Sequence, residues 1–242
     1  MASFYDPTSL DPKSVKFNDD LATLLGLRLI HSRQLFLYGA IEDIETYTET
    51  CPDLSRLTAT EITRIILELN LDDDLAQPAP RRPILLFINS PGGDSGEGFA
   101  LADAIEASKT PVWTINLGQW SSMGFLIGIA GRRRLSLARS TFLWHDGSTG
   151  YFGSSGKVQD TADFNKRYEN EVVKQHVLKH SNPETFTEAF YDAHVREEFY
   201  MLPEDALKFG FIDGIVTDLS AIFREAGYLP AAPVTSEDTP FS

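Results

Sequence analysis

The sequence is poor in cysteine. Its 242 residues include a single one, Cys51, so no internal disulfide can form. No histidines or carboxylates gather around Cys51 at the spacing of a metal site. We therefore expect it to be a packing residue.

Long hydrophobic runs are also absent. The longest ones, such as residues 84–88, are far shorter than the roughly 20 residues needed to cross a bilayer. The N-terminal residues have neither the basic region nor the apolar region of a secretory signal. We expect no membrane partner and a cytoplasmic location.

Positive charge is scarce. The chain has 21 Lys and Arg against 35 Asp and Glu, a net charge of −14. Duplex nucleic acids are bound by clustered cations that neutralise phosphates, so this balance argues against a nucleic-acid partner. The one basic run, Arg132-Arg133-Arg134, is interpreted as a solvated turn.

Apolar and polar segments alternate in the way typical of an α/β protein. The pattern predicts strands at residues 33–39, 84–89, 112–117 and 140–144, and helices at 59–70, 98–107 and 123–130. Buried strands that alternate with helices indicate a largely parallel sheet with the helices outside. Residues 71–82, which contain three consecutive aspartates and several prolines, are predicted to be a loop.

The remaining segments suggest one domain with two extensions. Residues 1–20 are predicted to be a mobile arm, 21–229 the folded domain, and 230–242 a disordered tail. Within the domain, residues 156–181 predict a long polar helix with a thin apolar stripe. Such a helix either covers an edge of the domain or packs against another copy of the chain.

Residues suited to acyl transfer follow three of the predicted strands. Gly92 and Gly93 come after the strand at 84–89, Ser122 after that at 112–117, and His145 directly after that at 140–144. A serine needs a base to become a nucleophile, and the tetrahedral intermediate needs N–H donors for its oxyanion. Taken singly, Ser122 fits a helix N-cap and His145 a structural histidine, and Ser121 is a rival to Ser122. The joint pattern favours a site for acyl transfer.

The order Gly-Gly, Ser, His resembles the ClpP family, the proteolytic subunits of the caseinolytic serine peptidases. The resemblance covers roughly residues 28–217 and is carried by Asn89-Ser90-Pro91-Gly92-Gly93, Ser122-Met123-Gly124, His145, Pro203-Glu204 and Phe209-Gly210-Phe211-Ile212-Asp213. It implies an α/β fold of the crotonase/ClpP type, with repeated β-β-α units and a protruding handle helix at about 156–181. In that fold Gly93 and Met123 would donate their N–H groups to the oxyanion. No metal and no organic cofactor are implied.

The resemblance also implies partners. Family members form stacked, typically heptameric rings that enclose a chamber and receive unfolded polypeptides from an AAA+ unfoldase. The unfoldase would use the ATP, because this chain has no P-loop pattern.

The third catalytic residue departs from the family pattern. Counting back from Phe209-Gly210, the family's orienting aspartate falls on Glu198, which retains the charge but adds a methylene. Asp192, Glu197 or no acid at all remain alternatives. A second departure is Asp146 directly after the histidine, because a carboxylate there favours the imidazolium and weakens it as a base.

Other functions stay open at this point. The altered acid is compatible with a non-catalytic ring subunit on the same scaffold. The two-donor oxyanion hole would also suit a crotonase-like acyl-CoA enzyme, which stabilises an enolate without a Ser-His pair. A phage head-maturation protease and, less favoured, a signal-peptide peptidase of the Ser-Lys type are the remaining alternatives.

Overall fold

The computed structural model describes residues 29–42, 57–76, 80–147 and 150–230. Its strands are β1 (Gln34–Tyr38), β2 (Ile84–Ser90), β3 (Val112–Ser121), β4 (Arg133–Leu137), β5 (Thr141–Trp144), β6 (Phe199–Met201) and β7 (Gly214–Val216). Its helices are α3 (Ala59–Leu75), α4 (Ser95–Ala107), α5 (Met123–Ile129), α6 (Ser155–Tyr168), α7 (Lys174–Lys179), α8 (Glu188–His194), α9 (Pro203–Lys208) and α10 (Leu219–Glu225), with a π-helical segment, η1 (Glu169–Val173), between α6 and α7. The predicted arm at 1–20, Cys51 and all of the predicted tail but Pro230 lie outside the described residues.

The strands form one sheet that is parallel except at one pair. Its main order is β1-β2-β3-β4-β7, and every neighbouring pair in that path is parallel. The long strand β3 pairs with β4 along its first half and with β5 along its second half, and β6 then joins β5 in the antiparallel direction. The expected α/β fold with a largely parallel sheet is confirmed.

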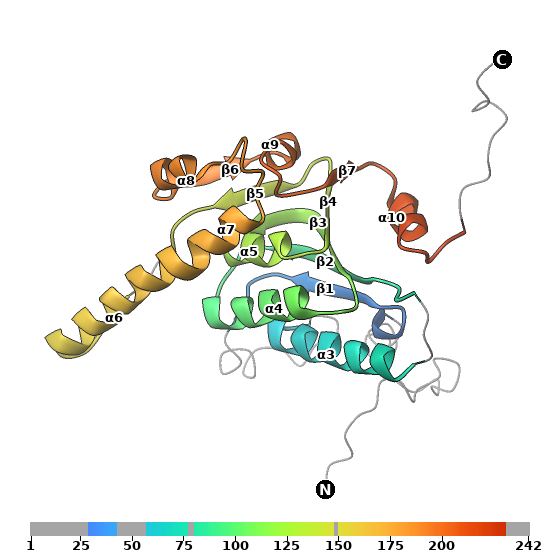
Figure 1. Ribbon diagram of the computed structural model, residues 1–242, viewed down its shortest axis with the longest axis horizontal. Helices are drawn as coiled ribbons and strands as arrows, with labels where there is room; N and C mark the ends of the chain where they lie inside the picture. Colours follow the sequence, from blue (N-terminus) through green and yellow to red (C-terminus); the bar gives the residue numbers. More distant parts are fainter. Residues whose placement is uncertain (1–28, 43–56, 77–79, 148–149, 231–242) are drawn as a thin grey trace, which may run out of the picture.

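Strand β2 is apolar along most of its length because both faces of the sheet are covered. Its alternate residues Ile84, Leu86 and Ile88 belong to the larger core, on the side of α3, α4 and α5. Leu85 and Phe87 point to the other face and join a smaller core beneath α10. Figure 1 shows the sheet between these helices.

Helix α3 is longer than the sequence pattern predicts. It continues through the aspartate run to Leu75, so the prediction of a loop at 71–82 is wrong for its first part. Carboxylates near a helix C-terminus are unfavourable with the helix dipole. Here distant cations offset that effect: Arg33 forms a salt bridge to Asp73 at 2.5 Å, and Lys109 contacts Asp74 at 3.0 Å.

The basic run is not a solvated turn as a whole. Arg132 is exposed, but Arg133 and Arg134 open strand β4 and are half-buried. The Arg134 guanidinium contacts the Asp213 carboxylate at 2.7 Å and donates to the carbonyl of His180 at 2.8 Å. The sequence interpretation failed because these acceptors lie far along the chain.

The long polar helix runs through α6, η1 and α7, from Ser155 to Lys179. Its first part projects away from the sheet and the other helices (Figure 1). No residue of α6 is buried, and Phe164 keeps 57% of its surface exposed. In contrast, Val173 and Val177, at the base of the helix, belong to the larger core.

The two-sided core generates a stability prediction. Leu86→Ala removes a fully buried side chain from β2 and should lower the free energy of unfolding by about 2–5 kcal/mol. Leu75→Ala is the matched control, since Leu75 is 77% exposed and its loss should change stability by less than about 0.5 kcal/mol. Urea denaturation at one fixed protein concentration measures both, and equal losses would contradict the assigned burial.

Candidate functional site

The candidate residues gather where strands β2, β3 and β5 end. In the parallel register Ser90 lies beside Trp120, and Ser121 beside Leu143. The glycine pair follows the end of β2, Ser122 follows β3, and His145 follows β5. Since the carboxyl ends of parallel strands meet at one edge, the sheet brings the three sequence segments together.

Ser122 occupies a strained turn between β3 and α5. Its φ is +53° and its ψ is −123°, a conformation that costs a non-glycine residue about 1–3 kcal/mol. Ser122 stands at the N-cap position of α5, yet its side chain makes no capping hydrogen bond. Its N–H donates to the carbonyl of Leu143 at 2.9 Å, which ties the turn to β5. The hydroxyl is therefore not used for helix capping.

The glycine pair packs directly against this turn. A Cβ on Gly92 would lie 2.7 Å from the Ser122 Cβ and 2.9 Å from the Met123 nitrogen. A Cβ on Gly93 would lie 2.0 Å from the carbonyl oxygen of Ile41, and both glycines have positive φ angles. Both positions therefore exclude a side chain.

Two backbone donors are left over at the same place. The Ile41 N–H donates to the carbonyl of Gly92, and the Ile41 carbonyl accepts from the N–H of Asp94. These two hydrogen bonds do not use the N–H of Gly93. Met123 is the first residue of α5, and its N–H likewise has no backbone acceptor among the described residues. First-turn N–H groups of a helix are unpaired by geometry and carry partial positive charge.

His145 meets Glu198 through the antiparallel pairing of β5 with β6. Trp144 pairs with Phe199, so the following His145 is level with the preceding Glu198. The His145 Nδ1 lies 3.0 Å from a Glu198 carboxylate oxygen, and the two side chains are 18% and 58% exposed. The other ring nitrogen, Nε2, is buried and has no hydrogen-bond partner among the residues that the structure describes.

The alternative residues are placed elsewhere. Asp192 lies 2.7 Å from the Lys174 ammonium. Glu197 forms no ion pair within the described parts of the chain. Ser121 is 7% exposed and its hydroxyl lies 3.5 Å from the Gln119 side-chain oxygen. Of the candidate acids weighed, Glu198 is the one beside His145.

A cavity of about 720 Å³ lies at the candidate site. Gly93, Ser122, Met123 and His145 all line it, whereas Ser121 does not. The long helix closes the opposite side with Ala162, Asn165, Lys166, Tyr168, Glu169 and Val173. The sequence analysis missed this second role of the helix, although spacings of three and four residues could have indicated one shared face.

Glu169 adds a half-buried carboxyl group to the cavity. It begins the π-helical segment, a local widening that is frequent at functional sites. Burial raises the pKa of Glu169, the Asp146 carboxylate raises it further, and the His145 ring opposes both effects. Asp94 adds another carboxylate to the lining, against the single ammonium of Lys166. Among the described residues, no three of the metal-ligating side chains that line this cavity lie close enough together to hold one ion.

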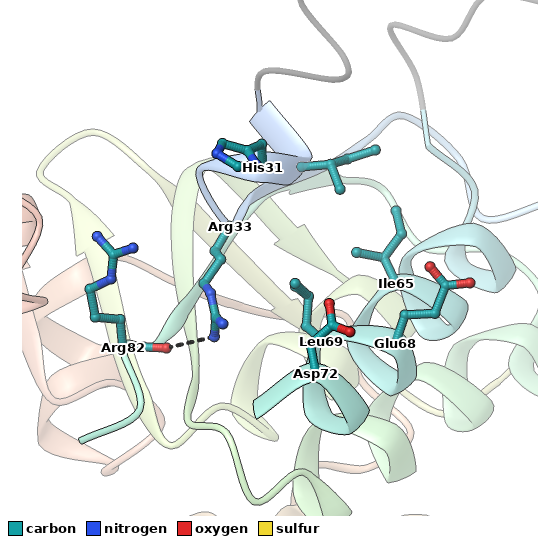
Figure 2. Close-up of a pocket in the computed structure, with 8 residues that line it drawn as sticks. His31, Arg33, Ile65, Glu68, Leu69, Asp72 and Arg82 are labelled. Carbon is teal, nitrogen blue, oxygen red and sulfur yellow. Dashed lines mark hydrogen bonds between the residues drawn. The ribbon is translucent and has the colours of Figure 1, made fainter. Parts of the chain in front are cut away.

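A second, smaller cavity of about 250 Å³ lies at the opposite edge of the sheet, where β1 and β2 begin (Figure 2). Arg33 donates there to the carbonyl of Arg82 at 3.2 Å. His31 is present, but neither serine nor cysteine lines the cavity. Among the described residues it therefore offers no hydroxyl or thiol nucleophile of the kind that Ser122 provides.

Comparison with known proteins shows the family. The family model described as Clp protease matches residues 20–218. One curated relative, the ATP-dependent Clp protease proteolytic subunit of Deinococcus radiodurans, is 30% identical over 139 residues, which are 57% of this chain. The match covers 66% of that relative, so it spans just under two thirds of the relative's length. No helix within the described ranges is both long and apolar enough to cross a membrane.

The site predicts a selectively reactive serine. A fluorophosphonate should add to Ser122, because His145 can take up the hydroxyl proton and the unpaired N–H groups can bind the phosphonyl oxygen. Intact-mass measurement should find one adduct on the wild type and on Ser121→Ala, and none on Ser122→Ala. An adduct that persists in Ser122→Ala and is lost in Ser121→Ala would transfer the role to Ser121.

Proposed function

Because the chain belongs to the Clp protease family, we propose that it is a proteolytic subunit that hydrolyses peptide bonds through an acyl-enzyme. Ser122 is the nucleophile, His145 the general base and acid, and Glu198 the orienting acid. Gly93 and Met123 donate to the oxyanion.

The reaction requires each of these groups in turn. As the Ser122 oxygen attacks the carbonyl carbon, His145 Nε2 accepts the hydroxyl proton, and the carbonyl oxygen becomes an oxyanion at the Gly93 and Met123 N–H groups. His145 then passes the proton to the leaving amine, and the C–N bond breaks to give an acyl-serine. Water, activated by the same histidine, hydrolyses the ester. Glu198 stabilises the imidazolium in both halves of the reaction.

One observation carries this proposal: the two ring nitrogens of His145 have different surroundings. Nδ1 contacts Glu198 at 3.0 Å. Nε2 is buried and has no hydrogen-bond partner among the described residues, and His145 lines the same cavity as Ser122. An unpaired buried nitrogen costs about 1–3 kcal/mol, so its position beside the Ser122 cavity calls for a reason. A base that must receive a proton at Nε2 accounts for it.

The proposed assembly is a pair of stacked heptameric rings in the cytoplasm that receive unfolded polypeptide from an AAA+ unfoldase. The exposed part of the long helix supports it, because no residue of α6 is buried within one chain and two apolar side chains, Phe164 in α6 and Val172 in η1, are exposed. The number of rings and the number of subunits in each ring are taken from the family and not from this chain.

A second candidate is a non-catalytic ring subunit. No hydrogen bond joins Ser122 to His145 Nε2, and Glu198 is 58% exposed. In enzymes without substrate, catalytic hydrogen bonds are often long and tighten only on binding, so the first observation is compatible with activity. The exposure of Glu198 is the observation that favours the non-catalytic alternative, and experiment can test it.

Glu198→Gln tests the orienting acid. The amide cannot stabilise the imidazolium and favours the wrong tautomer, so turnover of a fluorogenic peptide should fall by as much as about 10⁴-fold. Glu197→Gln, one residue away and without an ion pair, should retain wild-type turnover. Wild-type activity in Glu198→Gln, with Ser122→Ala inactive, would remove Glu198 from the mechanism.

Glu198→Asp separates the two candidate functions. It withdraws the carboxylate by one C–C bond, about 1.5 Å, and should reduce turnover if the present 3.0 Å contact is the catalytic one. An inactive wild type that becomes active as Glu198→Asp would instead identify a non-catalytic subunit.

Assembly is tested through α6. Light scattering of the wild type should give a mass many times 26.9 kDa. Phe164→Asp should lower that mass by placing a charge in the proposed contact, and Gln159→Asp, which adds the same charge to the same helix, should not. A wild-type monomer at micromolar concentration would refute the ring assembly and leave the chemistry of the site unaffected.

A further inference from the structure

Three side chains outside the Ser122 cavity converge at the base of the long helix. Glu106 lies near the end of α4, His176 lies on α7, and His180, four residues later, is the C-cap of α7. One Glu106 oxygen, Oε1, is 3.3 Å from His176 Nδ1 and 2.6 Å from His180 Nε2. One ligand atom from each of the three lies within 4.8 Å of the others.

The orientation of His176 is fixed by a backbone acceptor. Its Nε2 lies 2.9 Å from the carbonyl oxygen of Leu126, in α5, so this nitrogen carries the hydrogen. The neutral ring then presents the lone pair of Nδ1 to Glu106. Histidines that bind metals commonly donate their other N–H to a backbone carbonyl in this way.

The two histidines lie beside the Glu106 carboxylate in a largely buried position. The side chains of His176 and His180 are only 10% and 15% exposed. A neutral His176 places a nitrogen lone pair against a carboxylate oxygen, which is repulsive unless a cation lies between them.

The second oxygen of Glu106 is held separately. Lys179 donates to Oε2, so it orients the carboxylate and leaves Oε1 facing the two histidines. A cavity of about 470 Å³, lined in part by Glu106, Lys179 and His180, borders the group. An ion bound there could therefore take a water molecule as a further ligand.

We propose that Glu106, His176 and His180 bind one zinc ion, which fastens α7 to α4. Two imidazoles and one carboxylate, with a fourth position open, form a donor set typical of zinc. Bonds of about 2.0–2.2 Å in a tetrahedron separate neighbouring ligand atoms by about 3.3–3.6 Å. The 3.3 Å between His176 Nδ1 and Oε1 already matches this separation, and the 2.6 Å between His180 Nε2 and Oε1 is shorter and has to lengthen.

The ion would act structurally. It would join the base of the projecting helix to α4, and through His176 to α5, whose first residue follows Ser122. The proposal does not depend on peptidase activity. It differs from the family expectation, which implies no metal, and His176-x-x-x-His180 is the sequence spacing that indicates it.

The experiment uses the full chain after removal of metal with a chelator. Zinc is titrated in competition with a chromophoric chelator, and bound zinc is counted by elemental analysis. We expect one zinc per chain in the wild type and in His194→Ala, which removes a histidine outside the group. His180→Ala and Glu106→Gln should bind more than about tenfold more weakly. Equal binding by all four proteins would overturn the proposal.

A second measurement keeps the test independent of folding defects. Zinc should raise the unfolding temperature of the wild type and not that of His180→Ala, because only a protein that binds the ion is stabilised by it. An unchanged unfolding temperature in the wild type would mean that Glu106 only pairs with its basic neighbours.

Discussion

The hydrogen bond from the Ser122 N–H to the carbonyl of Leu143 is the contact on which the site depends. It continues the pairing of β3 with β5 by one residue, into the turn that carries the serine. By holding that turn against β5, it sets the level of Ser122 relative to His145. The pairing of β5 with β6 then brings Glu198 to the same level. Backbone bonds thus bring three side chains from distant parts of the sequence together.

The same turn is strained, and its neighbours stabilise it. The positive φ of Ser122 is unfavourable, but Gly92 packs against the turn where any side chain would collide. The Ser90 hydroxyl reinforces the glycine segment by donating to the carbonyl of Gly39 and accepting from the N–H of Gly92. Beneath the turn, the ring of Trp120 packs edge-on against Phe142 in the core. A rigid, buried foundation allows an unfavourable conformation to persist at the surface of the cavity.

Local patterns in the sequence predicted much of this arrangement. The apolar runs at 84–89 and 112–117 belong to β2 and β3, and their ends lead to the glycine pair and the serine. What the sequence did not predict depends on contacts between distant residues. The cations that extend α3, the Asp213 partner of Arg134 and the helix face that closes the cavity are invisible to a local pattern. Glu198 was found only by counting from a motif, and the reason for its position, the register of β6, required the fold.

The register of β6 limits which substitutions can preserve an acid beside His145. Glu198 directly precedes β6, so the register of that strand sets which residue stands beside the histidine. Substitution at this one position can vary the length or charge of the partner, whereas a shift of the strand by one residue changes which residue takes that place. The local architecture thus tolerates exchange between aspartate and glutamate more readily than it tolerates insertion or deletion between residues 195 and 201. Length variation in this part of the chain is therefore better accommodated before β6, in the turn at residues 181–187, where the histidine pairing is not disturbed.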